Sequence, residues 1–380
     1  MLPSEPEVLH TVLASFPPVQ HAFAYGSGVF KQPGLYDGHP EASAEGSAAA
    51  ADAVASGSGD RPMLDFIFAV DDPVAWHTEN LRRHAHHYSF LRHLGPAGMT
   101  AVAEKLGAGV YFNTLVPWAP HQLIKYGVVR LSALQADLLH WTTLYCAGRL
   151  HKPVATLTCH PGVAAAQEAN LRSALRAALL LLPPRFDTLD LLHAICAISY
   201  SGDVRMGLAE DSRKVHRIVQ GSEAGLRQLY SPLLGEAQQR WGALVAAGEA
   251  GGDAWAADDS TAAVGTLVAG LPAHVLQRLA AALGVQVVGA EQQQQQQQQQ
   301  QRCSGTAAAG LPAWQQPPGL GAVAAALAAR PAAQRARLLR HAIHAIVGAS
   351  SRRQAVSGVL TAGVGKSLRY GVAKLRKAWR

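Results

Sequence analysis

Hydrophobic residues in the first 160 positions form short runs of strand and helix type. Strand-like runs cover residues 21–25, 64–70, 109–113 and 124–131. Apolar residues with helical spacing cover residues 75–84 and 134–145. This alternation predicts a compact α+β domain over residues 1–160.

The pattern becomes mostly helical after residue 160. Helical periodicity covers residues 162–182, 189–198 and 204–219, which predicts a second, helical domain over residues 161–247. Residues 248–321 are rich in Ala, Gly and Gln and include ten consecutive glutamines, so we interpret them as a low-complexity insert in which only 271–288 suggests a short helix. Residues 322–380 form the C-terminal region.

A second insert interrupts the first domain. Residues 37–62 are Ala-, Gly- and Ser-rich and contain almost no large apolar side chain. Such a segment cannot bury enough surface to offset its ordering entropy, so we expect it to be disordered.

Composition narrows the class of protein. The chain has 380 residues, 49% hydrophobic and 16% charged, which excludes a wholly disordered chain. Its four cysteines form no CxxC pair, so we expect buried thiols in a reducing compartment rather than a disulfide scaffold or a zinc site. No apolar run approaches the roughly 20 residues of a bilayer span, and Glu5 and Glu7 are not typical of a targeting leader.

The net charge of +7 is distributed unevenly. Residues 330–380 contain twelve Lys or Arg and no Asp or Glu, whereas the preceding residues are net acidic. A basic segment on an acidic body points to an anionic partner surface, either lipid or nucleic acid.

The sequence Tyr25-Gly26-Ser27-Gly28 follows the first predicted strand and is the first candidate site. Glycines at a strand end allow backbone N–H groups to approach a phosphate, and the serine hydroxyl adds a donor. On the next predicted strand, Asp65 is placed to hold a metal that bridges phosphates. The alternative is a tight turn and a carboxylate at a strand end.

Several cations lie where burial is not expected, namely Lys125, Arg149 and Lys152. A triphosphate needs such groups for neutralisation, although solvated strand ends would show the same pattern. Asp203 follows a glycine and precedes a helical run, so it is either a second metal ligand or a helix N-cap.

Taken together, the motifs resemble a known family. FPPVQHAFAYGSGVFKQ (16–32), MLDFIFAVDDPVAWHTEN (63–80), HYSFLRHLG (87–95) and VYFN (110–113) are followed by IKYGVV (124–129), DLLHWTTLYCAGRLHKPV (137–154) and SYSGDVRMGLAED (199–211). In this order they resemble the mitochondrial translocator assembly and maintenance family of phosphatidate cytidylyltransferases, or CDP-diacylglycerol synthases.

The resemblance implies a nucleotidyltransferase-like domain, a winged-helix-like helical domain and a basic C-terminal helix. It implies CTP and phosphatidic acid as substrates, Mg²⁺ as cofactor, a role in cardiolipin synthesis, and a peripheral position on the matrix side of the mitochondrial inner membrane. Asp65 and Asp203 would hold Mg²⁺, Gly26, Ser27 and Gly28 would bind a phosphate, and Lys125 and Lys152 would neutralise the triphosphate and the lipid head group. The superfamily's second strand carboxylate is replaced by Ile67; Asp71, Asp72 and Glu210 are the other possible suppliers.

The last fifteen residues predict a membrane-binding amphipathic helix. On a helix, Leu368, Val372, Leu375 and Trp379 share one face, and cations that include Arg369, Lys374, Arg376 and Lys377 occupy the remainder. The alternative is a helix that packs on the protein's own core.

Aromatic residues for base stacking are scarce in this basic C-terminal segment, so no nucleic acid is expected as a partner. Two alternative functions stay open. One is a nucleotidyltransferase that acts on RNA or a small molecule, and the other is a non-catalytic inner-membrane assembly factor.

Overall fold

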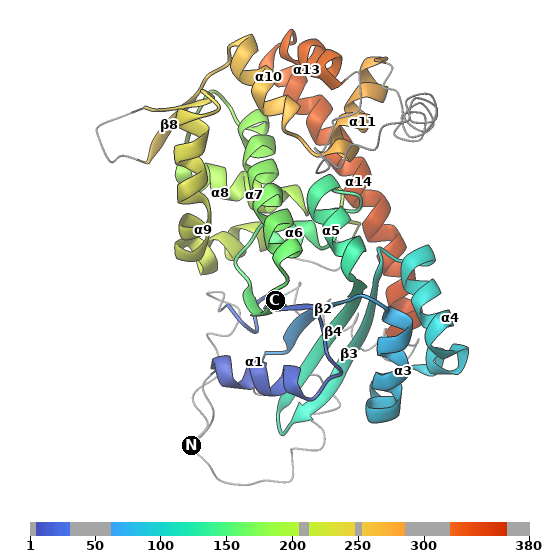
Figure 1. Ribbon diagram of the computed structural model, residues 1–380. Helices are drawn as coiled ribbons and strands as arrows, with labels where there is room; N and C mark the ends of the chain where they lie inside the picture. The colour runs from blue at the N-terminus through green and yellow to red at the C-terminus, as the bar shows by residue number, and fades with distance from the viewer. Residues whose placement is uncertain (1–4, 31–61, 205–212, 248–252, 286–319, 363–380) are drawn as a thin grey trace, which may run out of the picture.

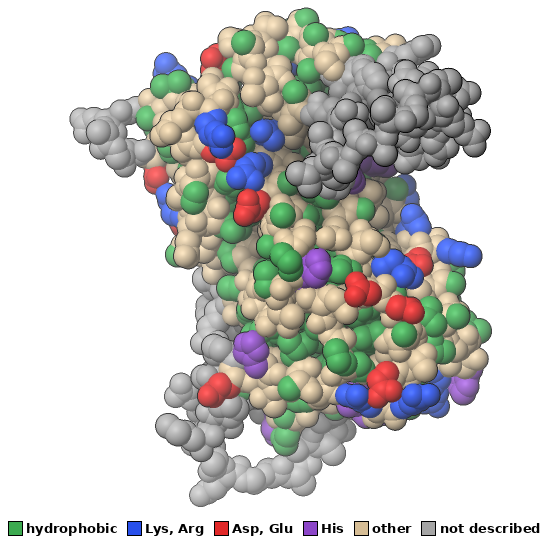
Figure 2. Space-filling model, viewed as in Figure 1, with side chains coloured by type: hydrophobic (Ala, Val, Ile, Leu, Met, Phe, Trp, Pro, Cys, Tyr) green, Lys and Arg blue, Asp and Glu red, His purple; other side chains and the backbone are tan. Residues whose placement is uncertain are grey.

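The computed structural model describes residues 5–30, 62–204, 213–247, 253–285 and 320–362. Figure 1 shows a lower part built on a β-sheet and an upper part built almost entirely from helices. The α+β class is confirmed. On the face of the molecule seen in Figure 1, both parts carry Lys and Arg side chains as well as Asp and Glu side chains (Figure 2). Of the insert 37–62, only residue 62 is described. The C-terminal residues 363–380 and Glu210 lie outside the described residues.

The larger sheet has five strands in the order β3-β4-β2-β1-β5. β2 and β4 are parallel, and every other neighbouring pair is antiparallel. The strands are β1 (His21–Tyr25), β2 (Leu64–Val70), β3 (Val110–Ala119), β4 (Gln122–Arg130) and β5 (Ala155–Thr158).

Alternating side chains of this sheet enter two hydrophobic clusters. Phe23, Ile67 and Phe112 belong to the cluster shared with α5 (Leu131–His140), α6 (Ala147–Leu150) and α7 (Pro161–Leu181). Phe66 and Tyr126 belong to the cluster that includes residues of α1 (Glu5–Ala14) and α3 (Pro73–His84). Because successive strand residues point to opposite faces, both faces of the sheet are buried.

Short helical segments connect α3 to β3. They are η1 (Ala85–His87), η2 (Phe90–Leu94), α4 (Gly95–Ala101) and the π-helical turn η3 (Val102–Leu106).

The helical part contains a second, three-stranded sheet in the order β6-β8-β7. Its elements are β6 (Arg185–Asp187), α8 (Thr188–Ile198), α9 (Lys214–Gln239), β7 (Leu244–Ala246), β8 (Ala254–Ala257), α10 (Thr261–Ala269), α11 (Ala273–Leu283), α13 (Leu320–Ala328) and α14 (Ala332–Ala362). α14 is long enough to run from the top of the helical part down to the β3 side of the large sheet (Figure 1).

Several sequence expectations need correction. The sequence pattern assigns residues 253–285 to the low-complexity insert, but β8 and α10 form there, and α11 agrees with the short helix suggested over 271–288. Val264, Leu267 and Leu279 are fully or almost fully buried, because apolar residues spaced among the alanines pack against α7, α13 and α14. The helix expected over 134–145 ends at His140. Cys159 is exposed, unlike the buried Cys146 and Cys196.

The third predicted helix of the second domain also differs. Within the described residues of 204–219, helix α9 begins only at Lys214, and it continues to Gln239 with a break at Ser222, whose φ and ψ are −132° and 15°. Arg213 is at the N-cap position of α9, so Asp203 does not cap this helix.

Candidate functional site

Three predicted site residues lie side by side on adjacent strands. Tyr25 on β1 pairs with Asp65 on β2, and Asp65 pairs with Lys125 on β4. The Lys125 ammonium is 3.0 Å from Asp65 Oδ1, and both side chains are about four-fifths buried. The same ammonium lies 4.6 Å from the centre of the Phe112 ring. The strand register therefore brings together a carboxylate and a cation that are 60 residues apart in the chain.

The glycine turn begins where β1 ends. The Val29 and Phe30 amides donate to the Gly26 carbonyl at 3.1 and 2.9 Å. Gly26 has φ of +86°, and a Cβ there would lie 3.5 Å from Asp65 Oδ2; a Cβ at Gly28 would lie 2.3 Å from the Met63 carbonyl oxygen. Both positions thus require glycine, one for its backbone conformation and one for close packing against β2. The turn holds the Ser27 backbone next to the start of the strand that carries Asp65.

Asp137 is a buried carboxylate for which the sequence predicted no role, and it shapes the turn between α5 and α6. Asp137 Oδ1 accepts hydrogen bonds from the amides of Thr143 and Leu144 at 2.7 and 2.8 Å, and Oδ2 accepts from those of Cys146 and Ala147 at 2.9 and 3.0 Å. These bonds replace the helix predicted over 134–145 with a turn. Trp141 and Leu144 have positive φ in this turn, a conformation that persists only where surrounding contacts impose it.

The turn leads directly into α6, which carries Arg149. The Arg149 guanidinium lies 3.9 Å from the Tyr145 ring centre and 5.3 Å from the Tyr25 ring centre, and it donates to the Tyr145 carbonyl. Arg149 is therefore held against the tyrosine that pairs with Asp65. The cation–π contacts and the backbone bond fix its orientation, which a solvated arginine would lack.

Lys152 follows α6 and links it to the end of α8. Its ammonium donates to the Gly148 carbonyl and, at 3.1 Å, to Ser199 Oγ, and it lies 5.1 Å from the Tyr200 ring centre. Burial lowers the pKa of Lys152 to about 8; Cys196 opposes this shift and the Arg149 charge adds to it. Ser199 and Tyr200 belong to a motif recognised in the sequence, but only the tertiary structure shows that they contact Lys152.

Asp203 is buried in the turn that carries Tyr200. Its amide donates to the Tyr200 carbonyl at 3.2 Å, and the amide of Val204 donates to Ser351 Oγ on α14 at 3.2 Å. The structure thus places Asp203 on the same turn as the partners of Lys152. In the described part of the chain, no three His, Cys, Asp or Glu side chains form a ready-made metal site.

The other acids considered at the sequence level fall elsewhere. Asp71 and Asp72 follow the far end of β2 from Asp65, and six residues of strand span about 20 Å. Asp72 caps α3 by accepting the Val74 and Ala75 amides. Neither acid is placed to share a metal with Asp65.

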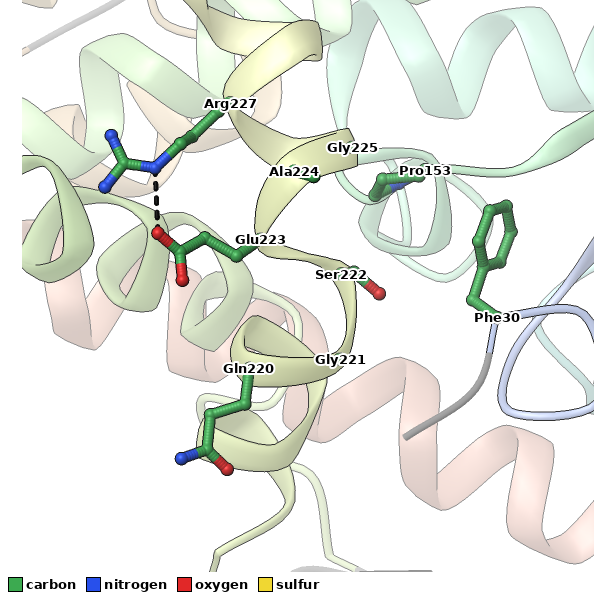
Figure 3. Close-up of a pocket in the computed structure, with 9 residues that line it drawn as sticks. All are labelled: Phe30, Pro153, Gln220, Gly221, Ser222, Glu223, Ala224, Gly225 and Arg227. Carbon is green, nitrogen blue, oxygen red and sulfur yellow. Dashed lines mark hydrogen bonds and ion pairs between the residues drawn. The ribbon is translucent and has the colours of Figure 1, made fainter. Parts of the chain in front are cut away.

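A pocket of about 590 Å³ adjoins this site. Phe30, from the end of the glycine turn, and Pro153, next to Lys152, form one side of it (Figure 3). The opposite side is the interrupted turn of α9 around Ser222, where Glu223 is paired with Arg227 at 2.8 Å. The pocket therefore neighbours the candidate site through Phe30 and Pro153, but Asp65, Lys125, Arg149 and Lys152 do not line it.

Comparison with known proteins shows which family the chain is similar to. A family model described as "Phosphatidate cytidylyltransferase, mitochondrial" matches residues 9–377. The protein of that name from Danio rerio is 38% identical over 361 residues, which cover 94% of this chain and 90% of that protein. The Xenopus laevis protein is 46% identical over 59% of this chain and 61% of its own length, and that of Schizosaccharomyces pombe is 40% identical over 57% and 50%.

Proposed function

The chain belongs to the family of mitochondrial phosphatidate cytidylyltransferases, and we propose that the residues around Asp65 and Lys152 carry its reaction. That reaction transfers CMP from CTP to phosphatidic acid and gives CDP-diacylglycerol and pyrophosphate. The observation that supports this assignment most strongly is the clustering of charged groups next to the glycine turn: Lys125 is paired with Asp65, Arg149 lies against Tyr25 beside Asp65, and the Arg149 charge acts on Lys152.

The chemistry requires positioning more than proton transfer. A phosphate oxygen of phosphatidic acid attacks the α-phosphorus of CTP, the bond from that phosphorus to the bridging oxygen breaks, and pyrophosphate leaves with the electron pair. Since the attacking phosphate is already an anion, no general base is needed. The protein must hold two anions together and stabilise the charge that grows on pyrophosphate.

The individual residues divide this task. The turn at Gly26–Gly28 would bind a phosphate, while Lys125 and Lys152 would neutralise the triphosphate and the lipid phosphate. Arg149 lies against the rings of Tyr25 and Tyr145, so its cation is held beside the strand pair that carries Asp65 and would take part in nucleotide binding.

Asp65 is suited to Mg²⁺ because its Oδ2 faces the glycine turn while Oδ1 binds Lys125. Mg²⁺ is commonly held by one or two carboxylates together with substrate phosphates, so a single strand carboxylate is compatible with it. When bound, the ion would neutralise triphosphate charge. Asp203 remains the predicted second ligand.

The whole protein would act at the matrix side of the mitochondrial inner membrane and supply cardiolipin synthesis. We also propose that residues 366–380, outside the described residues, bind an anionic membrane surface. Truncation after Ser367 should weaken binding to anionic vesicles while CTP binding is unchanged; equal vesicle binding would refute this role.

The catalytic proposal is tested by incubation with CTP, phosphatidic acid and Mg²⁺, followed by measurement of pyrophosphate and CDP-diacylglycerol. Equal amounts of both products are expected, with none when diacylglycerol replaces phosphatidic acid. The Asp65→Asn variant serves as the site-specific control. Absence of turnover in the wild-type protein would favour a non-catalytic assembly role, and transfer to RNA instead of lipid would favour the other alternative.

A further inference from the structure

Exposed apolar side chains gather where α14 meets the segments between α3 and β3. Phe90 and Leu94 of η2 are 55% and 58% exposed, and Leu106 of η3 is 48% exposed. On α14, Val356 and Val359 are 58% and 49% exposed. In the described residues, these five make up most of the strongly exposed large hydrophobic side chains, since only Leu189 and Val245 are comparable. We call the five residues the η2–α14 surface.

Direct contacts hold these three segments together. Gln354 Oε1 of α14 accepts the Ala108 amide at 2.9 Å, and Arg353 donates to the carbonyls of Glu104 and Lys105 at 3.3 and 3.1 Å. Leu360 packs against the buried cluster under η2 that contains Leu91. α14 also contacts η2 and η3 directly. The three segments that carry the exposed side chains therefore lie next to one another.

Cations outnumber acids around this surface. Arg92, Lys105 and Arg352 are exposed on the same three segments. The acid there is Glu104, which is paired with Arg130 at 3.0 Å. A partner of this surface must therefore be apolar at its centre and anionic at its edge.

The chain's own C-terminal segment does not meet this requirement. It continues from α14 and adds six further Lys or Arg residues and no acid between residues 363 and 380. Packing it on a cationic surface would bring like charges together. In contrast, an anionic bilayer would attract both the surface and the segment.

We propose that the η2–α14 surface docks on an anionic lipid bilayer. Phe90 and Leu94 enter the boundary between head groups and acyl chains, while Arg92, Lys105 and Arg352 contact anionic head groups. This inference rests on the proposed function only in that phosphatidic acid is a bilayer lipid. No helix in the described ranges is both long and apolar enough to cross a membrane, so contact through such a surface provides access to that substrate.

The test is co-sedimentation of the full chain with vesicles of phosphatidylcholine and phosphatidylglycerol, the latter being anionic but not a substrate. The double variant Phe90→Ser/Leu94→Ser should bind about tenfold more weakly, because the apolar area that enters the bilayer is removed. The matched control Leu189→Ser/Val245→Ser removes two apolar side chains elsewhere, 37% and 60% exposed, and should bind normally. The double variant Arg92→Glu/Lys105→Glu should lose affinity chiefly at low salt.

Turnover of a water-soluble short-chain phosphatidic acid separates this proposal from the catalytic one. It should be the same in wild type and in the Phe90→Ser/Leu94→Ser variant, whereas turnover on phosphatidic acid in vesicles should fall with the vesicle binding. Unchanged vesicle binding of that variant would overturn the docking proposal even if the enzyme is active. Absence of turnover on the short-chain substrate in wild type would instead overturn the proposed function.

Discussion

Lys152 should make the activity depend on pH in a range where an ordinary lysine does not titrate. Burial lowers its pKa to about 8. Below that pH the Lys152 amine carries a proton and a positive charge, and above it the proton is lost. Neutralisation of the substrate phosphates therefore weakens as pH rises. At about pH 9, roughly one Lys152 in ten keeps its proton, so kcat/KM for CTP should be about tenfold below its plateau value.

The assay is kcat/KM for CTP at saturating Mg²⁺, measured between about pH 6.5 and pH 9.5, because this parameter reports groups of the free enzyme. Lys152→Arg should remove the decline above pH 8, since a guanidinium stays charged throughout. Lys152→Gln should be about a hundredfold slower at neutral pH, with residual activity that no longer falls with the same profile.

A wild-type profile that is flat up to pH 9.5 would refute the role of the Lys152 charge. Persistence of the same decline in Lys152→Gln would assign it to another group. Lys105→Arg, at an exposed position of η3, is the control for a general lysine effect and should leave the profile unchanged.

Three further changes test other parts of the site. Asp65→Asn should lower kcat by about 10² to 10³ with little change in melting temperature, whereas Asp71→Asn, at the opposite end of β2, should retain activity; comparable losses in both would contradict the assignment. Gly28→Ala, whose Cβ would meet the Met63 carbonyl at 2.3 Å, should weaken CTP binding measured by calorimetry about tenfold, and wild-type affinity would show that the turn does not contact the nucleotide. Asp137→Asn should reduce the free energy of unfolding by about 3 kcal/mol in urea denaturation, because its amide cannot accept all the backbone bonds of the carboxylate; a loss under 1 kcal/mol would contradict the structural role.

The sequence alone determined the local elements that carry the candidate site. The strands at 21–25 and 64–70 occur where alternating and continuous apolar runs predict them, because a strand buried on both faces needs apolar side chains throughout. The glycine turn and the acid after Leu64 were also recognisable, since few residue types suit a positive φ or a phosphate contact.

Only the tertiary structure decided which of these residues meet. The parallel pairing of β2 with β4 places Lys125 beside Asp65, and no local pattern encodes a register between segments 60 residues apart. Likewise, Asp137 ends a helix that periodicity extends to 145, because its carboxylate binds four backbone amides that a continued helix would need for itself.

The same distinction explains the error over residues 253–285. The segment groups with the low-complexity insert because alanine is its commonest residue and a glutamine run follows it, and composition records neither spacing nor partners. Burial of Val264, Leu267 and Leu279 depends on α7, α13 and α14, which supply the opposing apolar faces. The sequence therefore determined which residue types were available at each position, and long-range packing determined which of them became core, which became site, and which remained exposed at the η2–α14 surface.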